Sequence, residues 1–174
     1  AAILAEVLAG RRLPASGEVA VDGSPLRSGD RLVALVAPGE PFVAGGLNDN
    51  LAALSDLPLD RVARAAVGEA CGLAEVVDAL AGRPLVIDGR PLAAFHRLLV
   101  LVARVIPSPY RVLVVVDPMP WVNAVRGELW RTAVVRASVG RTSIWITPDR
   151  DLAARATLAM EYRHGSLRRA DRPA

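Results

Sequence analysis

The feature that most constrains the fold is a short apolar run that ends in an acid, residues 111–118 (RVLVVVDP). An unbroken run of valine and leucine of this length is typical of a hydrophobic β-strand, and Asp117 and Pro118 mark its end. The chain of 174 residues contains no lysine and no glutamine, and all 21 of its basic residues are arginine. No lysine of this segment can therefore take part in chemistry at the end of this strand.

Length and composition indicate one domain of ordinary size. A chain of 174 residues can bury a substantial core but is too short for two large domains. Its hydrophobic fraction of 52% and mean hydropathy of +0.33 are high, so we expect some apolar surface to be buried against something else. No stretch reaches the ~18 uncharged apolar residues of a membrane-spanning helix. The chain begins without methionine, and we expect it to be part of a longer protein.

The charge, cysteine and histidine content exclude several kinds of site. The net charge is +3 and the pI about 9.9, but arginines and acids alternate along the chain and only residues 163–172 are concentrated in basic residues, so no nucleic-acid partner is expected. The single cysteine, Cys71, cannot form an internal disulfide and is expected to be a buried thiol. Two isolated histidines, His96 and His164, give no zinc-binding pattern.

Periodicity and turn signals divide the first half of the chain into recognisable elements. Residues 3–9 are apolar at helical spacing and stop at Gly10, which predicts a short opening helix. Residues 17–23 and 30–38 are predicted strands, and we expect these two strands to pair with each other. From 51 to about 80 the apolar residues recur at i, i+3 and i+4, which predicts helices with one buried face.

The second half alternates helices and strands, an order that favours a mostly parallel sheet with helices on its faces. The predicted elements are a helix over 93–104, the strand over 111–118, a helix over 125–138, a strand over 141–148, a short helix over 152–156 and a last strand near 158–162. The sequence therefore predicts the α/β class.

The order of these pieces resembles the nucleotide-binding domain of ABC transporters, most closely that of exporters. The strand 111–118 looks like the Walker B element of a P-loop ATPase. The resemblance covers nearly the whole chain and rests on order and spacing, because no single motif is intact. It is carried by SGEVAVDGSPL (16–26), the Q-loop-like VALVAPGEPFVAGGLNDNLA (33–52), DGRPLAAFHRLLVLVARVI (88–106), GRTSIWITP (140–148) and the closing hairpin MEYRHGSL (160–167).

The resemblance implies a P-loop NTPase-like fold: a mostly parallel sheet with a small antiparallel strand pair and a helical insertion. It further implies that residues 1–174 are one such domain without its N-terminal part. Its sheet core would comprise 1–50 and 105–174, and a helical subdomain would comprise about 51–104.

At the phosphate-binding end, the resemblance places alanines where the family has functional side chains. Ala1 takes the position of the phosphate-binding lysine and Ala2 that of the magnesium-binding hydroxyl. A cation ~4 Å from a phosphate contributes about 4 kcal/mol at an effective dielectric near 20, or roughly three powers of ten in affinity. Arg11 cannot replace this lysine, because ten helical residues at ~1.5 Å each place it about 15 Å away.

At the end of the Walker-B-like strand, the resemblance makes Asp117 the candidate catalytic residue in one of two registers. The ungapped spacing puts Val116 at the magnesium-binding aspartate and Asp117 at the catalytic glutamate. If Asp117 is instead the magnesium ligand, Pro118 occupies the position of the base. Either register lacks one of the two acids that water activation requires, so no metal site is expected.

The remaining family motifs are altered as well. Pro38 replaces the Q-loop glutamine, Pro148 the switch histidine and Asn123 the D-loop aspartate, and residues 92–96 (LAAFH) stand in place of the signature LSGGQ. In the family the signature contacts nucleotide held by the opposite subunit, so this change implies a damaged partner site too.

Simpler interpretations of the same residues remain open. Asp117 can be an acid that caps a turn before Pro118, and His96 a histidine at the boundary of a buried helix. The three tryptophans, Trp121, Trp130 and Trp145, are expected to be packing residues, although Trp121 could fill space left by nucleotide.

The Gly45-Gly46 pair is either a flexible loop or a plain hairpin connection. In the family this region faces the membrane domain, and the apolar Phe42 and Val43 fit such a contact surface.

Three functions are compatible with these observations. The first is a degenerate ABC domain with a structural or regulatory role, no cofactor and no ATPase activity. The second is a divergent ATPase that uses ATP and Mg²⁺ with a phosphate loop upstream of Ala1, and the third is an interaction module unrelated to nucleotide. The resemblance implies a second nucleotide-binding domain and a transmembrane domain as partners, at the cytoplasmic face of the membrane, and the composition suggests a GC-rich bacterium.

Overall fold

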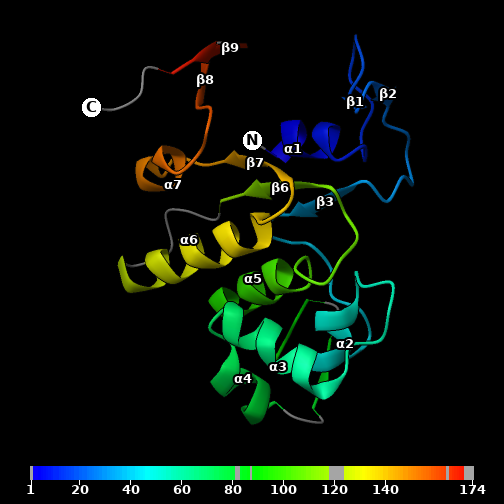
Figure 1. Cartoon of the computed structure of the whole chain (residues 1–174), viewed down its shortest axis with the longest axis vertical. Helices are drawn as coiled ribbons and strands as arrows, with labels where there is room; N and C mark the ends of the chain where they lie inside the picture. The colour runs from blue at the N-terminus through cyan, green and yellow to red at the C-terminus, as the bar shows by residue number, and fades with distance from the viewer. Residues whose placement is uncertain (1, 81–82, 87, 118–123, 164, 171–174) are drawn as a thin grey trace.

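The centre of the molecule is a three-stranded parallel sheet in the order β3-β6-β7 (Figure 1). The strands are β3 (Val33–Val36), β6 (Val112–Val116) and β7 (Thr142–Ile146). In this computed structural model, residues 2–80, 83–86, 88–117, 124–163 and 165–170 are described. Leu35 lies beside Val114, and Val114 beside Ile144, so the apolar run of β6 is the middle strand. The predicted α/β class with a mostly parallel sheet is confirmed.

Helices cover both faces of this sheet, because side chains along a strand point alternately to opposite sides. On one face, Val112, Val114 and Val116 of β6 belong to an apolar cluster with Ala5 of α1 (Ala2–Leu8). On the other face, Leu113 and Val115 join the larger core with α5 (Ala94–Ala103) and α6 (Ala124–Ser138). Figure 1 shows α1 on one side of the sheet and α5 and α6 on the other. The opening helix, the helix over 93–104 and the helix over 125–138 were thus correctly predicted.

Beyond α5 lie the helices of the predicted insertion, on the side away from the sheet (Figure 1). They are α2 (Leu47–Ala52), α3 (Arg61–Ala70) and α4 (Ala74–Ala79). The Asp60 side chain caps α3 by accepting a hydrogen bond from the backbone N–H of Ala63 at 2.7 Å. Cys71, after α3, is fully buried, and burial raises the pKa of its thiol to about 12, so the prediction of a buried thiol is confirmed.

The segment before α2 is more ordered than the sequence indicated. Gly45 and Gly46 form β4 (Gly45–Gly46), which pairs antiparallel with β5 (Pro84–Leu85), so the glycine pair is part of a short strand. The buried side chain of Asn50 holds this segment by accepting from the N–H of Val43 and donating to the carbonyls of Val43 and Gly46. Phe42 is 4% exposed and packs in the main core, so it does not belong to a contact surface, whereas Val43 is exposed.

Two short antiparallel hairpins flank the sheet. The first joins β1 (Ala20–Val21) to β2 (Ser24–Pro25), and the second joins β8 (Met160–Arg163) to β9 (Ser166–Arg169). The predicted pairing of 17–23 with 30–38 was wrong. Asp22 and Gly23 both have positive φ, which forms a tight turn and folds β1 back onto β2, while the fully buried β3 pairs with β6.

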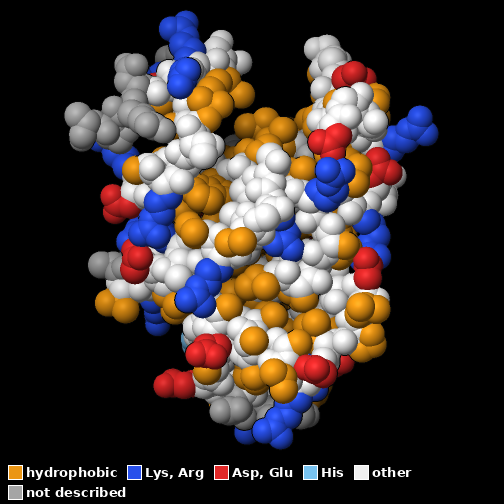
Figure 2. Space-filling model, viewed as in Figure 1, with side chains coloured by type: hydrophobic (Ala, Val, Ile, Leu, Met, Phe, Trp, Pro, Cys, Tyr) orange, Lys and Arg blue, Asp and Glu red, His pale blue; other side chains and the backbone are white. Residues whose placement is uncertain are grey.

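Apolar side chains are also present at the surface. Figure 2 shows hydrophobic side chains at the base of the hollow between the two hairpins. Large apolar residues that are exposed include Ile3 of α1, Leu158 before β8, and Met160, Tyr162 and Leu167 of the second hairpin. Within the described residues, none of the helices combines the length and the hydropathy needed to cross a membrane.

Replacing Leu113 by alanine should destabilise the fold strongly, because this side chain is fully buried in the middle strand. We expect the free energy of unfolding of Leu113→Ala to fall by about 2–5 kcal/mol, measured by urea denaturation. Leu13→Ala is the matched control, since Leu13 is 86% exposed and its loss should change stability by less than about 0.5 kcal/mol. Equal effects of the two variants would contradict the central position of β6.

Candidate functional site

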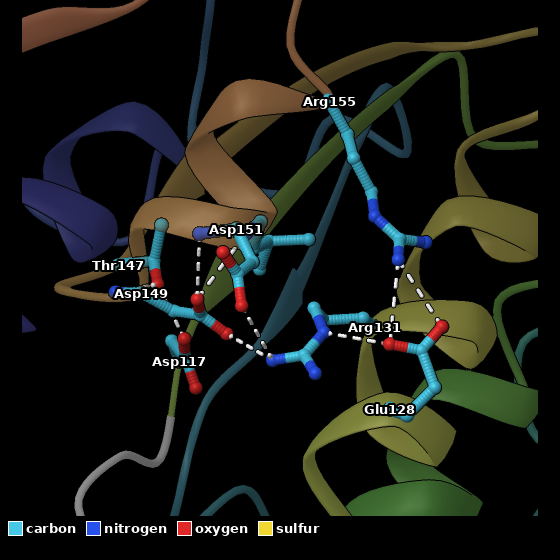
Figure 3. Close-up of polar contacts among 8 residues, drawn as sticks. Asp117, Glu128, Arg131, Thr147, Asp149, Asp151 and Arg155 are labelled. Carbon is cyan, nitrogen blue, oxygen red and sulfur yellow. Dashed lines mark hydrogen bonds and ion pairs between the residues drawn. The ribbon is translucent and has the colours of Figure 1, made fainter. Parts of the chain in front are cut away.

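The candidate site lies where the parallel strands end, because carboxyl ends of parallel strands meet at one edge of a sheet. Asp117 directly follows β6 and Thr147 directly follows β7. The Asp117 side chain is 7% exposed and accepts a short hydrogen bond from the Thr147 hydroxyl (Figure 3). The candidate catalytic carboxylate therefore has a protein partner on the neighbouring strand.

A chain of polar contacts continues from Thr147 into α7 (Arg150–Ala154) and α6. The Thr147 Oγ1 accepts from the backbone N–H of Asp149 at 2.8 Å. Asp149 caps α7, with Oδ1 accepting from the N–H of Asp151 at 2.9 Å. Its other oxygen, Oδ2, accepts from Nη1 of Arg131 on α6 at 2.8 Å. Hydrogen bonds thus connect the ends of two strands to two helices.

Arg131 is the central cation of this arrangement. Its Nε lies 3.0 Å from Oε2 of Glu128, and Arg155 lies 3.1 Å from Oε1 of the same glutamate (Figure 3). We call Asp117, Glu128, Arg131, Thr147, Asp149 and Arg155 the strand-end network. Hydrogen bonds to Asp149 and then Glu128 raise the pKa of Arg131, which therefore stays charged.

Two carboxylates of the network, Asp149 and Glu128, have lowered pKa values. Burial raises the pKa of Asp149, but the hydrogen bond from Arg131 and those from the backbone N–H groups of Leu152 and Asp151 lower it by more. The pKa of Asp149 is therefore below its usual range. The pKa of Glu128 is lowered first by its hydrogen bond from Arg131 and then by that from Arg155. All these contacts are internal to the protein.

The residues around Asp117 determine whether the carboxyl edge of the sheet could bind a metal ion or a phosphate. Val116, at the magnesium-aspartate position of one register, packs in the apolar cluster with Ala5 of α1. Within the described residues, no group of three His, Cys, Asp or Glu side chains is arranged to hold a metal ion. Arg11 forms a bidentate pair with Glu40, at 2.5 and 2.8 Å, so its charge is already neutralised by a carboxylate.

The other residues singled out from the sequence lie in several places. Ala2 is exposed at the start of α1, and Pro38 and Pro148 are exposed in loops. Leu92 is buried, and Phe95 and His96 are half-buried at the start of α5 with ring centroids 6.3 Å apart. His96 therefore lies at the boundary of the core, as predicted. Five of the named residues lie outside the described residues: Ala1, Pro118, Trp121, Asn123 and His164.

Two tryptophans are packing residues, as predicted. Trp130 is 1% exposed in the main core, and Trp145 is half-buried with its Nε1 donating to Ser138 Oγ at 3.2 Å. Sequence analysis did not identify Arg131, Thr147 or Asp149. The aspartate before the predicted helix at 152–156 is an N-cap signal that could have indicated Asp149. No local signal links Arg131 to it, because the two residues are 18 positions apart.

Comparison with known proteins finds a distant similarity. No protein-family model matches the chain. The chain is 30% identical, over 175 aligned positions, to the ABC transporter ATP-binding protein RamB of Streptomyces coelicolor. The alignment covers 94% of this chain and 29% of RamB, so the chain spans less than a third of that relative's length. This similarity supports an ABC ATPase-like domain.

The ion pair of Asp149 should make the stability of the protein depend on acid pH. Because the folded pKa of Asp149 is below the unfolded value of about 3.9, its contribution is present above about pH 4 and is lost as pH falls through the folded pKa. Asp149→Asn should therefore show a smaller fall in the free energy of unfolding between about pH 6 and pH 3, measured by urea denaturation.

Asp151→Asn is the matched control for this measurement. Its side chain is 80% exposed and its carboxylate lies 3.9 Å from Arg131, so the variant should keep the acid dependence of the parent protein. If Asp149→Asn also kept the parental dependence, the ion pair with Arg131 would not be the source of the acid sensitivity.

Proposed function

We propose that this chain is a degenerate ATP-binding-cassette domain of a transporter-like membrane protein, with a structural or regulatory role and weak or absent ATP binding and hydrolysis. The observation that carries this proposal is the hydrogen bond between Asp117 and Thr147. Its carboxylate, at the end of the middle parallel strand, is buried and accepts a hydrogen bond from Thr147. This hydrogen bond ties the carboxyl group to the neighbouring strand, which supports a structural role for Asp117.

The similarity to RamB supports the family part of the proposal. It extends over 94% of the chain, and RamB is described as an ATP-binding protein of an ABC transporter. The parallel order β3-β6-β7, with an acid directly after the middle strand, is consistent with a P-loop NTPase-like fold. We therefore infer that the chain descends from a domain that bound ATP.

The basic residues of the chain support weak or absent ATP binding. The chain has no lysine, and the two arginines discussed above, Arg11 and Arg131, are already paired with carboxylates. Moving either guanidinium to a phosphate would break an existing ion pair, so its net contribution to nucleotide affinity would be small. No cofactor is therefore assigned to the domain, and ATP with Mg²⁺ would be its ligand only if family activity were retained.

The proposed partners follow from the same similarity. They are a second ABC nucleotide-binding domain, identical or different, and the transmembrane domain of the transporter, which would place this domain at the cytoplasmic face of a bacterial membrane. A nucleic-acid partner is not proposed, because arginines and acids are interspersed along most of the chain.

Isothermal titration of the chain with Mg-ATP tests the proposal directly. Loss of one phosphate-binding cation weakens binding by about three powers of ten, so we expect no micromolar binding and no measurable turnover. Asp117→Asn should leave this nucleotide response unchanged but lower the free energy of unfolding, because an amide replaces the carboxyl group that accepts from Thr147. Micromolar Mg-ATP affinity would refute the proposal.

The position of Asp117 favours one alternative, a divergent ATPase whose phosphate loop lies upstream. An acid at the carboxyl end of a middle parallel strand is where P-loop enzymes hold their metal ligand. The longer protein that contains this chain distinguishes the two functions. Turnover in that protein that is lost on Asp117→Ala, with the fold retained by circular dichroism, would establish the ATPase.

A further inference from the structure

A cavity of about 420 Å³ lies on the far side of α5 from the sheet. Its lining residues come from the paired strands β4 and β5, from α2, α3 and α4, and from the chain after α4. Its lining residues are Gly45, Gly46, Leu47, Asn48, Asp49, Arg64, Val77, Leu80, Arg83 and Pro84. The volume is within the range of about 300–1,000 Å³ that is usual for sites that bind small molecules.

Two arginines give this cavity a positive charge. Among the described residues, the guanidinium groups of Arg64 and Arg83 have no ion-pair or hydrogen-bond partner; Arg64 is half-buried and Arg83 is exposed. Other arginines of the structure are ion-paired, among them Arg11, Arg12, Arg31, Arg90, Arg111, Arg131, Arg155 and Arg163. A partly buried guanidinium without a partner is costly, so an anion that pairs with it is stabilised.

The acid in the lining does not neutralise these arginines. Asp49 is the only acid among the described lining residues, and its Oδ2 accepts a hydrogen bond from the N–H of Gly46 at 2.6 Å. Gly45 permits this close approach. Its φ is +132°, and a Cβ at this position would lie 2.5 Å from the same Asp49 oxygen. The Asp49 carboxylate is therefore held by the backbone N–H of Gly46.

The rest of the lining is apolar. Val77 and Leu80 of the α4 region and Pro84 of β5 contribute hydrocarbon surface next to the two guanidinium groups. A ligand that fits both parts has an anionic head for the arginines and a short apolar body for the wall.

We propose that this cavity binds a small organic anion, with Arg64 and Arg83 pairing with a phosphate or carboxylate head and Val77 and Leu80 contacting a short apolar body. Arginine suits this role, because its planar guanidinium can donate two parallel hydrogen bonds to either kind of head group. The site uses none of the residues of the strand-end network, and it goes beyond the proposed function because it does not involve ATP.

Titration of the full chain with n-butyl phosphate, followed by amide resonances in an NMR spectrum, tests the proposal. We expect saturable shifts at Gly45, Gly46 and Leu80, with butyrate as a second probe that distinguishes the carboxylate from the phosphate head. Arg64→Gln and Arg83→Gln should each weaken binding by about tenfold, and Asp49→Asn should strengthen it because a like charge is removed.

Arg61→Gln is the matched control. Arg61 is an exposed arginine at the start of α3 that does not line the cavity, so its variant should bind the probe as the parent does. If an arginine-to-glutamine variant unfolds, Arg64→Lys and Arg83→Lys retain the charge and should bind more weakly than the parent through the loss of the paired hydrogen bonds.

Several results would overturn the proposal. They are the absence of saturable shifts with both probes, equal binding of n-butanol and n-butyl phosphate, and equal binding of inorganic phosphate and n-butyl phosphate. An acidic peptide that binds where neither small anion does would replace the proposal with a protein-docking surface. The result with Mg-ATP at the strand ends does not affect any of these outcomes, so the two proposals can fail separately.

Discussion

Burial of β6 on both faces is the constraint on which the rest of the structure depends. Leu113, Val114 and Val115 are all 1% exposed or less. A strand this deeply buried must satisfy its backbone polar groups through neighbouring strands, and β3 and β7 supply these partners. Its alternating side chains then need an apolar layer on each side, which α1 provides on one face and α5 and α6 on the other.

The same burial explains why the acid at the end of β6 needs a partner. A carboxylate that leaves water is destabilised unless hydrogen bonds replace its hydration, and Asp117 accepts one from Thr147. Thr147 accepts in turn from the N–H of Asp149, and Asp149 is paired with Arg131. The end of the middle strand is therefore joined to β7, α7 and α6, so the position that resembles a catalytic acid also holds these elements together.

The strand ends and the cavity differ in whether their charged side chains are paired. At the strand ends, each charge has a partner within the chain, and the low pKa of Asp149 reflects this pairing. In the cavity between β4, β5 and the helices of the insertion, Arg64 and Arg83 have no such partner among the described residues. Unpaired cations of this kind favour an external anion. The contacts at the strand ends support a structural role for Asp117. The arginines of the cavity, which lack a partner among the described residues, support the binding of an anion other than ATP.

Local patterns predicted the elements well where one residue type dominates a segment. The apolar run of β6, the helical periodicity before Gly10 and the stripe of α5 each specify their own structure. The partner of β3 was predicted incorrectly, because the Asp22-Gly23 turn folds β1 onto β2 and leaves β3 to pair with a strand some 80 positions later, as Val33 beside Val112 shows. Phe42 was assigned to a contact surface because the family resemblance places this region against the membrane domain, but Phe42 is buried in the core, next to a segment that Asn50 holds through Val43.

By itself, the sequence determined the α/β class, the positions of most helices and strands, and the absence of lysine from residues 1–174, since these follow from residue identity and local spacing. Only the tertiary structure decided which strands are neighbours, that Asp117 is bound by Thr147, and that Arg64 and Arg83 face one cavity. These are contacts between residues far apart in the chain, and their geometry is set by how helices and sheet pack around a shared core.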